Sequence, residues 1–251
     1  MGGDFLRHSA KTVVFALTGI GLLCFLVSGA WLLRYYAQTR AYEEIREELR
    51  LMPDGPVQSR LDFLREQYPG VAALLSIPAL EMEEPVCAAQ DNDYYMSRDF
   101  TGRKSRYGAL FLDCEQDFES RNMSVYGHYS KKGAMFGKLK AFRDGAFLAR
   151  HPEFTLETAA GTQRWHIFAV LLLPAKGEGF WEWRAQGDAA PARVEAFARE
   201  ARARALCETG EPVYPGDRLL SLTTCAYDFP NARLVILAVN HTNNVHEGEY
   251  S

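Results

Sequence analysis

The sequence predicts a mainly β protein: a closed or nearly closed barrel of eight short strands, decorated with helices and preceded by a transmembrane helix. Two observations predict this architecture. Residues 12–33 form a run of 22 residues without a charge. Residues 72–240 hold eight short segments that alternate or run apolar, with Gly, Asp or Asn between them and few helical interruptions. At 251 residues the chain suits one ordinary domain with additions.

The apolar run 12–33 is long enough to span a bilayer as a helix. A cleaved signal peptide is the alternative, because Ser28, Gly29 and Ala30 offer small residues. The run exceeds the usual apolar core of a signal peptide, which favours an uncleaved anchor. The short basic tail, residues 1–11, favours a cytoplasmic N-terminus. We therefore expect a single-pass protein of the cell membrane whose residues 34–251 are extracellular.

Residues 34–60 predict a helical stalk and a linker. Glutamate and arginine recur at helical spacing over 35–50, and the Pro-Asp-Gly-Pro sequence at 53–56 then breaks the helix. A second amphipathic helix follows and ends at Pro69-Gly70. The outer domain is expected to occupy residues 61–251.

The strand-like segments of this domain follow one another at short intervals. They are 72–77, 85–89, 107–112, 122–127, 153–158, 164–173, 217–225 and 232–240. Two helical segments stand between them, at 134–143 and 189–207. Pro191 suits the start of the second, long helix, which precedes the last two strands.

Charge and cysteine content exclude several classes of protein. The net charge of −4 gives no general basic footprint for nucleic acid. Cys24 lies in the anchor, and the four other cysteines are widely spaced, without a CxxC pair or a metal-ligand spacing. We therefore expect no metal, no cofactor and no disulfide scaffold, with one special thiol among incidental ones.

The segment 221–233, SLTTCAYDFPNAR, identifies that thiol. Cys225 ends a strand-like run and Arg233 opens the next, and the short connection predicts that the two strands are antiparallel neighbours. Cys225 and Arg233 should then lie side by side. A fixed cation beside a thiol suits a thiolate nucleophile and its oxyanion. The alternative is a buried structural cysteine beside a surface arginine.

A thiol nucleophile also needs an acid/base group to protonate its leaving group. Of the six histidines, His128 is the best placed, because it follows a strand beside Gly127, which permits a tight approach. His241 directly follows the Arg233 strand and stays open as an alternative. The remaining histidines fall in the N-terminal tail, a loop, an apolar strand and the C-terminal tail.

Together, these motifs resemble the sortases, membrane-anchored cysteine transpeptidases of Gram-positive bacteria, and class B in particular. The cysteine and arginine of 221–233 match that family, as does the YGHY loop within 125–139. Residues 90–113, QDNDYYMSRDFTGRKSRYGALFLD, resemble the class B segment that runs from DN-x-YY to G-x-FLD. The helix at 189–207 corresponds to the extra helix of class B. The resemblance covers roughly residues 61–240.

The resemblance implies a sortase-type barrel in which His128 is the general acid/base, Cys225 the nucleophile and Arg233 the oxyanion and substrate-positioning group. It also implies a substrate groove, whose expected contacts are Asn92, Met96, Thr223 and Trp181. Simpler roles stay open for two of these: an Asx turn for Asn92 and packing for Met96. Asp228 is expected either to orient His128 or Arg233, or to serve the turn.

The activity implied is cleavage of a C-terminal sorting signal of the Asn-Pro-x-Thr type in secreted proteins, after the threonine. The acyl group then passes to an amine of the cell wall peptidoglycan. One alternative is a pilin-polymerising sortase that uses a pilin lysine. Another is a catalytically silent barrel that binds peptides in the same groove.

Overall fold

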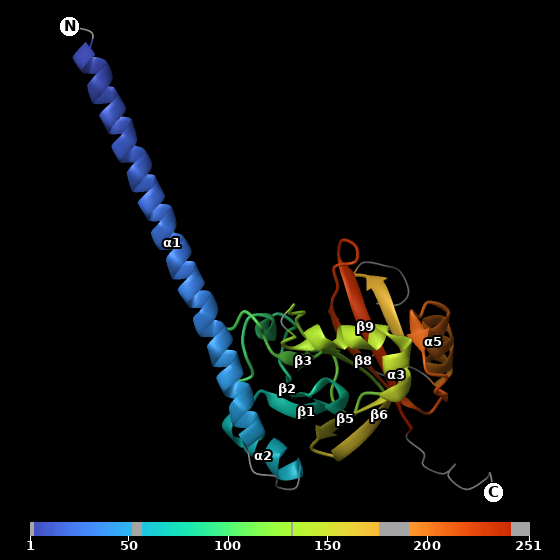
Figure 1. The fold of residues 1–251 in the computed structure, drawn as a ribbon. Helices are drawn as coiled ribbons and strands as arrows, with labels where there is room; N and C mark the ends of the chain where they lie inside the picture. Colours follow the sequence, from blue (N-terminus) through green and yellow to red (C-terminus); the bar gives the residue numbers. More distant parts are fainter. Residues whose placement is uncertain (1–2, 52–56, 132, 176–190, 242–251) are drawn as a thin grey trace, which may run out of the picture. The chain divides into compact units, whose positions relative to one another are not determined.

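The computed structural model describes residues 3–51, 57–131, 133–175 and 191–241 (Figure 1). The chain divides into two compact units, Met1–Pro53 and Asp54–Ser251. The first unit consists of helix α1, Gly3–Leu51. Its apolar part is long enough to cross a membrane, and the most apolar stretch has a mean hydropathy of 2.0. The expected anchor and stalk are therefore parts of one uninterrupted helix.

The second unit is built on a mainly antiparallel sheet that closes on itself. The strands of the described residues are β1 Val71–Ile77, β2 Met82–Cys87, β3 Leu110–Leu112, β4 Asn122–Tyr126, β5 Glu153–Thr158, β6 Gly161–Pro174, β7 Cys207–Glu208, β8 Arg218–Cys225 and β9 Ala232–Asn240. Their order is β5-β1-β2-β3-β4-β8-β9-β6-β7, and β5 also pairs with β6. That pairing closes an eight-stranded barrel, and the two-residue β7 adds to β6 outside it. The predicted barrel is confirmed.

The helices of this unit connect or cover the strands. They are α2 Val57–Gln67, α3 Gly145–Arg150 and α5 Pro191–Ala203, together with the 3-10 helices η1 Pro78–Leu80, η2 Tyr94–Met96 and η3 Phe136–Arg143. The helix expected over 189–207 extended too far at its C-terminal end. It ends at Ala203 because the chain turns there, and Leu206 N–H donates to the Val170 carbonyl, which leads Cys207 into pairing with β6.

Helix α5 packs on the face of β6, β8 and β9 to which Val235 and Leu237 point (Figure 1). Val194 and Phe197 of the helix are buried in that cluster. Since alternate residues of a strand share a face, Arg233 lies on the same face of β9, at the start of the strand. This face of the sheet is therefore apolar where α5 covers it. Arg233, at the start of β9, is a charged residue on the same face.

Candidate active site

Three neighbouring strands bring the predicted catalytic residues to one level of the sheet. β4 and β8 are parallel, and Tyr126 is paired with Thr223. His128 lies two residues after Tyr126, and Cys225 lies two residues after Thr223. Because the strands are parallel, both residues lie at the same level of the sheet. β8 and β9 are antiparallel, and Cys225 is paired directly with Arg233. The predicted pairing of Cys225 with Arg233 is confirmed.

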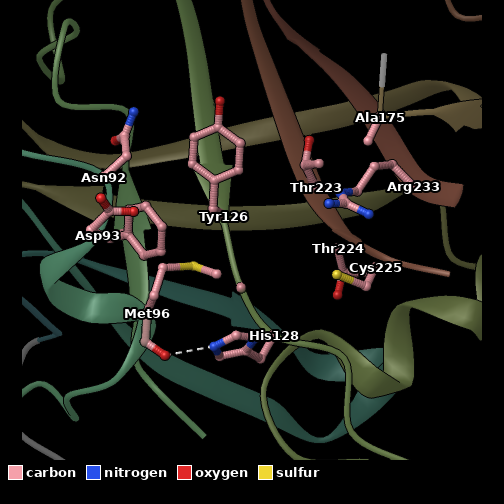
Figure 2. A pocket seen from close by; sticks show the side chains of 12 residues that line it. Asn92, Asp93, Met96, Tyr126, His128, Ala175, Thr223, Thr224, Cys225 and Arg233 are labelled. Atoms are coloured by element: carbon pink, nitrogen blue, oxygen red, sulfur yellow. Dashed lines mark hydrogen bonds between the residues drawn. The ribbon is translucent and has the colours of Figure 1, made fainter. Parts of the chain in front are cut away.

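A pocket of about 300 Å³ opens at this place. Figure 2 shows His128, Cys225 and Arg233 around the same space. The full lining is Asn92, Asp93, Met96, Phe111, Tyr126, Gly127, His128, Ala175, Thr223, Thr224, Cys225 and Arg233. The pocket therefore brings together six of the seven site residues that the sequence predicted. The seventh, Trp181, lies outside the described residues.

His128 is held by the backbone around it. Its Nε2 lies 2.7 Å from the carbonyl oxygen of Met96 (Figure 2). Because a carbonyl only accepts, Nε2 carries the proton, and Nδ1 is the nitrogen left to exchange one. The chain just before His128 packs closely against Leu110 and Phe136, and only glycine fits at position 127, because a Cβ there would clash with both side chains.

Cys225 and Arg233 are both half-buried at the two ends of a hairpin loop. Arg233 donates from Nη1 to the carbonyl of Ala232 at 3.0 Å. The loop is closed by the Ala226 N–H, which donates to the Ala232 carbonyl at 2.9 Å, and by Asn231 in the left-handed region at φ 60°. Asparagine tolerates that conformation better than most residues.

Two threonine hydroxyls in the pocket wall stand out by their burial. Thr223 and Thr224 are each 2% exposed, and neither Oγ1 has a hydrogen-bond partner among the described residues. A buried hydroxyl without a partner is costly. Both residues line the pocket, with these hydroxyl oxygens buried beneath its surface.

Asn92 and Met96 line the pocket in ways that rule against their simpler roles. The Asx turn at this chain reversal is made by Asp91, whose Oδ1 accepts from the backbone N–H groups of Asp93 and Tyr94. Asn92 instead accepts at Oδ1 from the Cys114 N–H at 2.9 Å. The Met96 side chain is 42% exposed, so it is a surface of the pocket and not a packing element.

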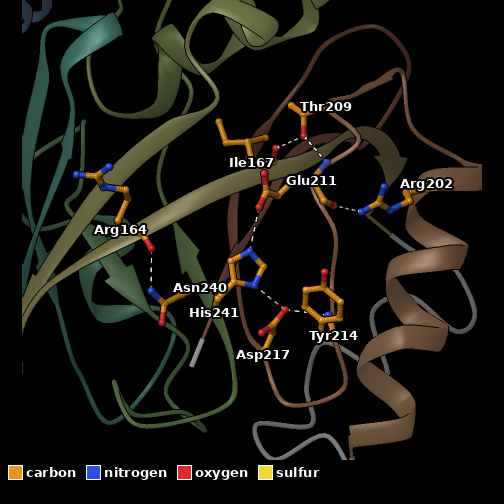
Figure 3. Close-up of polar contacts among 9 residues, drawn as sticks. All are labelled: Arg164, Ile167, Arg202, Thr209, Glu211, Tyr214, Asp217, Asn240 and His241. Carbon is orange, nitrogen blue, oxygen red and sulfur yellow. Dashed lines mark hydrogen bonds and ion pairs between the residues drawn. The ribbon is translucent and has the colours of Figure 1, made fainter. Parts of the chain in front are cut away.

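Two alternatives from the sequence lie elsewhere in the structure. His241 is hydrogen-bonded between Asp217 and Glu211, at 2.9 Å from each, and does not line the pocket (Figure 3). Asp228 forms an ion pair with Arg143 at 2.7 Å. Of the roles left open for Asp228, orienting His128 or Arg233 is not what the structure shows, because its carboxylate is engaged by Arg143.

The structure adds pocket residues that the sequence reasoning did not single out. Phe111 and Tyr126 line the pocket from β3 and β4, where they are paired across the two strands. Asp93 lines it from the loop before η2. Alternation along the strand 122–127 places Tyr126 and His128 on one face, and that signal could have identified Tyr126.

Comparison with known proteins agrees with this fold and site. The sortase domain model matches residues 75–241. Sortase B of Listeria monocytogenes is 27% identical over 190 residues, which cover 73% of this chain and 74% of that protein. The structure of Clostridium perfringens sortase B has 28% identity and a TM-score of 0.66, over 72% of this chain and 98% of that one.

The structure of Staphylococcus aureus sortase B, at 18% identity, has a TM-score of 0.68 over 80% of this chain and 97% of that one, which supports the fold. With a family model that matches most of the chain, and with class B enzymes among its relatives in both sequence and structure, the protein belongs to the sortase family and resembles its class B members.

Proposed function

We propose that this protein is a cysteine transpeptidase that cleaves a sorting signal of the Asn-Pro-x-Thr type after the threonine and joins the acyl group to a cell wall amine. The observation that carries the proposal is the convergence of His128, Cys225 and Arg233 on one pocket. Membership of the sortase family supports the reaction class. Asn92, Met96 and Thr223, on the same pocket, are the proposed contacts with the peptide.

In the first half of the reaction, the Cys225 thiolate attacks the threonine carbonyl carbon and forms the C–S bond. The carbonyl oxygen gains the negative charge, which the Arg233 guanidinium stabilises. The C–N bond then breaks, and His128 gives its Nδ1 proton to the departing amine. The part of the substrate that ends in the threonine stays on Cys225 as a thioester, and the C-terminal fragment that follows the threonine is released.

In the second half, an amine attacks the thioester, and His128 takes the proton that this amine loses. The Met96 carbonyl stabilises the imidazolium through its bond from Nε2–H. The C–S bond breaks and Cys225 leaves as thiolate. We propose a peptidoglycan amine as the acceptor.

The N-terminal helix fits this role, because an anchor keeps the enzyme where exported substrates emerge. We propose that α1 crosses the cell membrane once and that the unit Asp54–Ser251 lies outside. Residues 1–11 would then face the cytoplasm, since short basic segments stay inside.

The test uses the full chain in detergent with a panel of peptides that contain Asn-Pro-x-Thr, and intact-protein mass spectrometry. A thioacyl adduct on Cys225 that decays faster with an added peptidoglycan cross-bridge amine supports the proposal. Cys225→Ala should form no adduct, and turnover by that variant would refute the mechanism. Faster decay with a pilin lysine peptide alone would assign the acceptor to pilins. Peptide binding without an adduct would indicate a silent binding barrel.

A further inference from the structure

The carboxylate of Asp113 accepts hydrogen bonds from two residues that line the pocket, Tyr126 and Asn92. Asp113 directly follows β3 and is 8% exposed. Its Oδ2 accepts from the Tyr126 hydroxyl at 2.8 Å. Its Oδ1 accepts from the Glu115 N–H at 3.2 Å and, more weakly, from Asn92 Nδ2 at 3.4 Å. A buried carboxylate is tolerated when it is hydrogen-bonded in this way, so Asp113 ties two pocket residues to the end of β3.

These contacts fix which way the Asn92 amide points. Asn92 Oδ1 accepts from the Cys114 N–H at 2.9 Å, while Nδ2 faces the Asp113 carboxylate. Turning the amide around would place its NH₂ group against a backbone N–H and its oxygen against a carboxylate. Both contacts would then be repulsive. Asp113 and the Cys114 N–H therefore hold Asn92 in a single orientation.

The fixed orientation decides what Asn92 offers to a ligand. One Nδ2 proton is used toward Asp113, and the other has no partner among the described residues. Asn92 lines the pocket, and this unpartnered N–H is the donor that it can offer to a ligand there, while its oxygen already accepts from the Cys114 N–H. The complementary group on a ligand is a carbonyl oxygen.

We propose that Asp113 is a positioning residue for peptide recognition: it fixes the Asn92 amide so that the pocket binds a carbonyl oxygen of the donor peptide. The same carboxylate accepts a hydrogen bond from the Tyr126 hydroxyl, which holds that ring as a wall of the pocket. This inference rests on the proposed function, because it takes the donor peptide as the ligand.

The test measures binding in a Cys225→Ala background, so that it is independent of turnover. A fluorescent Asn-Pro-Gln-Thr peptide is titrated against the full chain in detergent, and polarisation gives Kd. Asp113→Ala should weaken binding about tenfold, as expected for a lost hydrogen bond in a buried site. Asn92→Ala should weaken it similarly, and the double variant no further, because both remove one interaction.

Two further variants separate positioning from folding. Asp113→Asn can still accept from Asn92 at Oδ1, with its own amide facing the Tyr126 oxygen, so binding should stay within about threefold. The exchange Asn92→Asp with Asp113→Asn keeps the net charge and the Cys114 bond, but removes the donor and the Glu115 bond. It should bind at least as weakly as Asp113→Ala.

Two results would overturn the inference: wild-type affinity in Asp113→Ala, or additive losses in the double variant. A loss of Tm equal in Asp113→Asn and Asp113→Ala, with equally weak binding, would make the residue structural and would overturn it too. Binding that follows the expected pattern without a thioacyl adduct in the Cys225 enzyme would instead sink the proposed reaction and leave the role of Asp113 intact.

Discussion

Arg143 and Asp228 form a two-pronged ion pair, with Nη2–Oδ1 at 2.7 Å and Nη1–Oδ2 at 3.2 Å. The pair joins the end of η3 to the loop between Cys225 and Arg233. A second contact reinforces it, since the rings of Tyr129 and Tyr227 meet edge to face with their centroids 5.3 Å apart. The segment that carries His128 and the loop that follows Cys225 are therefore tied together at two points.

Breaking this ion pair should lower activity more than stability. Both side chains are partly exposed, so Arg143→Ala should cost no more than about 1 kcal/mol of unfolding free energy. The rate of thioacyl formation should fall several-fold, because the loop between the proposed nucleophile and its cation loses a tether. Arg143→Lys keeps the charge but loses the paired geometry, and should be intermediate. Stopped-flow acylation and thermal melts check this, and wild-type rates in Arg143→Ala would contradict it.

Gly108 should matter for the placement of His128. Its φ is +62°, and a Cβ there would lie 2.5 Å from the Tyr95 carbonyl oxygen and 3.0 Å from Cδ2 of His128. Gly108→Ala should therefore displace the imidazole and reduce the rate of acylation at least tenfold. It should also lower the free energy of unfolding by at least about 1 kcal/mol, because alanine is strained in this backbone region.

Gly102→Ala is the matched control for Gly108→Ala. Gly102 also has a positive φ, +85°, but a Cβ there meets only the Tyr94 hydroxyl, at 3.6 Å. It should lose less stability than Gly108→Ala, because no backbone atom opposes its Cβ, and it should keep its acylation rate. Equal rates in the two variants, measured by the same adduct assay, would show that Gly108 does not place His128.

The local pattern of the sequence was enough to predict the strands around the site. The segments expected at 217–225 and 232–240 are β8 and β9 to within one residue, and the short connection between them predicted the pairing of Cys225 with Arg233. This succeeded because a hairpin is a local structure, whose register follows from its loop.

Features that depend on distant contacts could not be predicted in this way. Arg143 and Asp228 are 85 residues apart, and nothing near either one in sequence identifies its partner. Cys207 leaves the expected helix because it is paired with Val170 of β6, far from it in sequence. Tertiary pairing overrides helix propensity there. The role of Asp113 likewise depends on how β3 and β4 come together.

The four thiols of the second unit should react at very different rates. Burial raises the pKa of the Cys87 thiol to about 12, so it is almost wholly protonated at pH 8. Burial, with the nearby Asp144 carboxylate, raises the pKa of Cys207. Desolvation and the carboxylates of Asp113 and Glu115 raise the pKa of Cys114, although its side chain is exposed.

Cys225 opens onto the pocket beside a cation, which is the setting of reactive cysteines. It should therefore be alkylated first by iodoacetamide at pH 8, and Cys87 last. Peptide mapping by mass spectrometry after timed quenching gives the labelling rate of each cysteine and distinguishes these four from Cys24 of α1. Slow labelling of Cys225, at the rate of Cys207, would argue against a nucleophile and for a silent binding barrel.

His241 should make stability depend on pH at the far end of β8 from Cys225. Burial opposes its charge, but hydrogen bonds to Glu211 and Asp217 outweigh this and raise its pKa above the usual 6.5 (Figure 3). The folded protein thus holds a proton that the unfolded chain releases. The stabilisation is fully present below about pH 6.5 and is lost as pH rises through the folded pKa.

Wild-type Tm should therefore fall over that interval more than the Tm of His241→Asn. Glu211→Gln, which keeps the ring but removes one carboxylate, should shift the fall to lower pH. Parallel melting curves for wild type and His241→Asn would show that this network does not hold the proton.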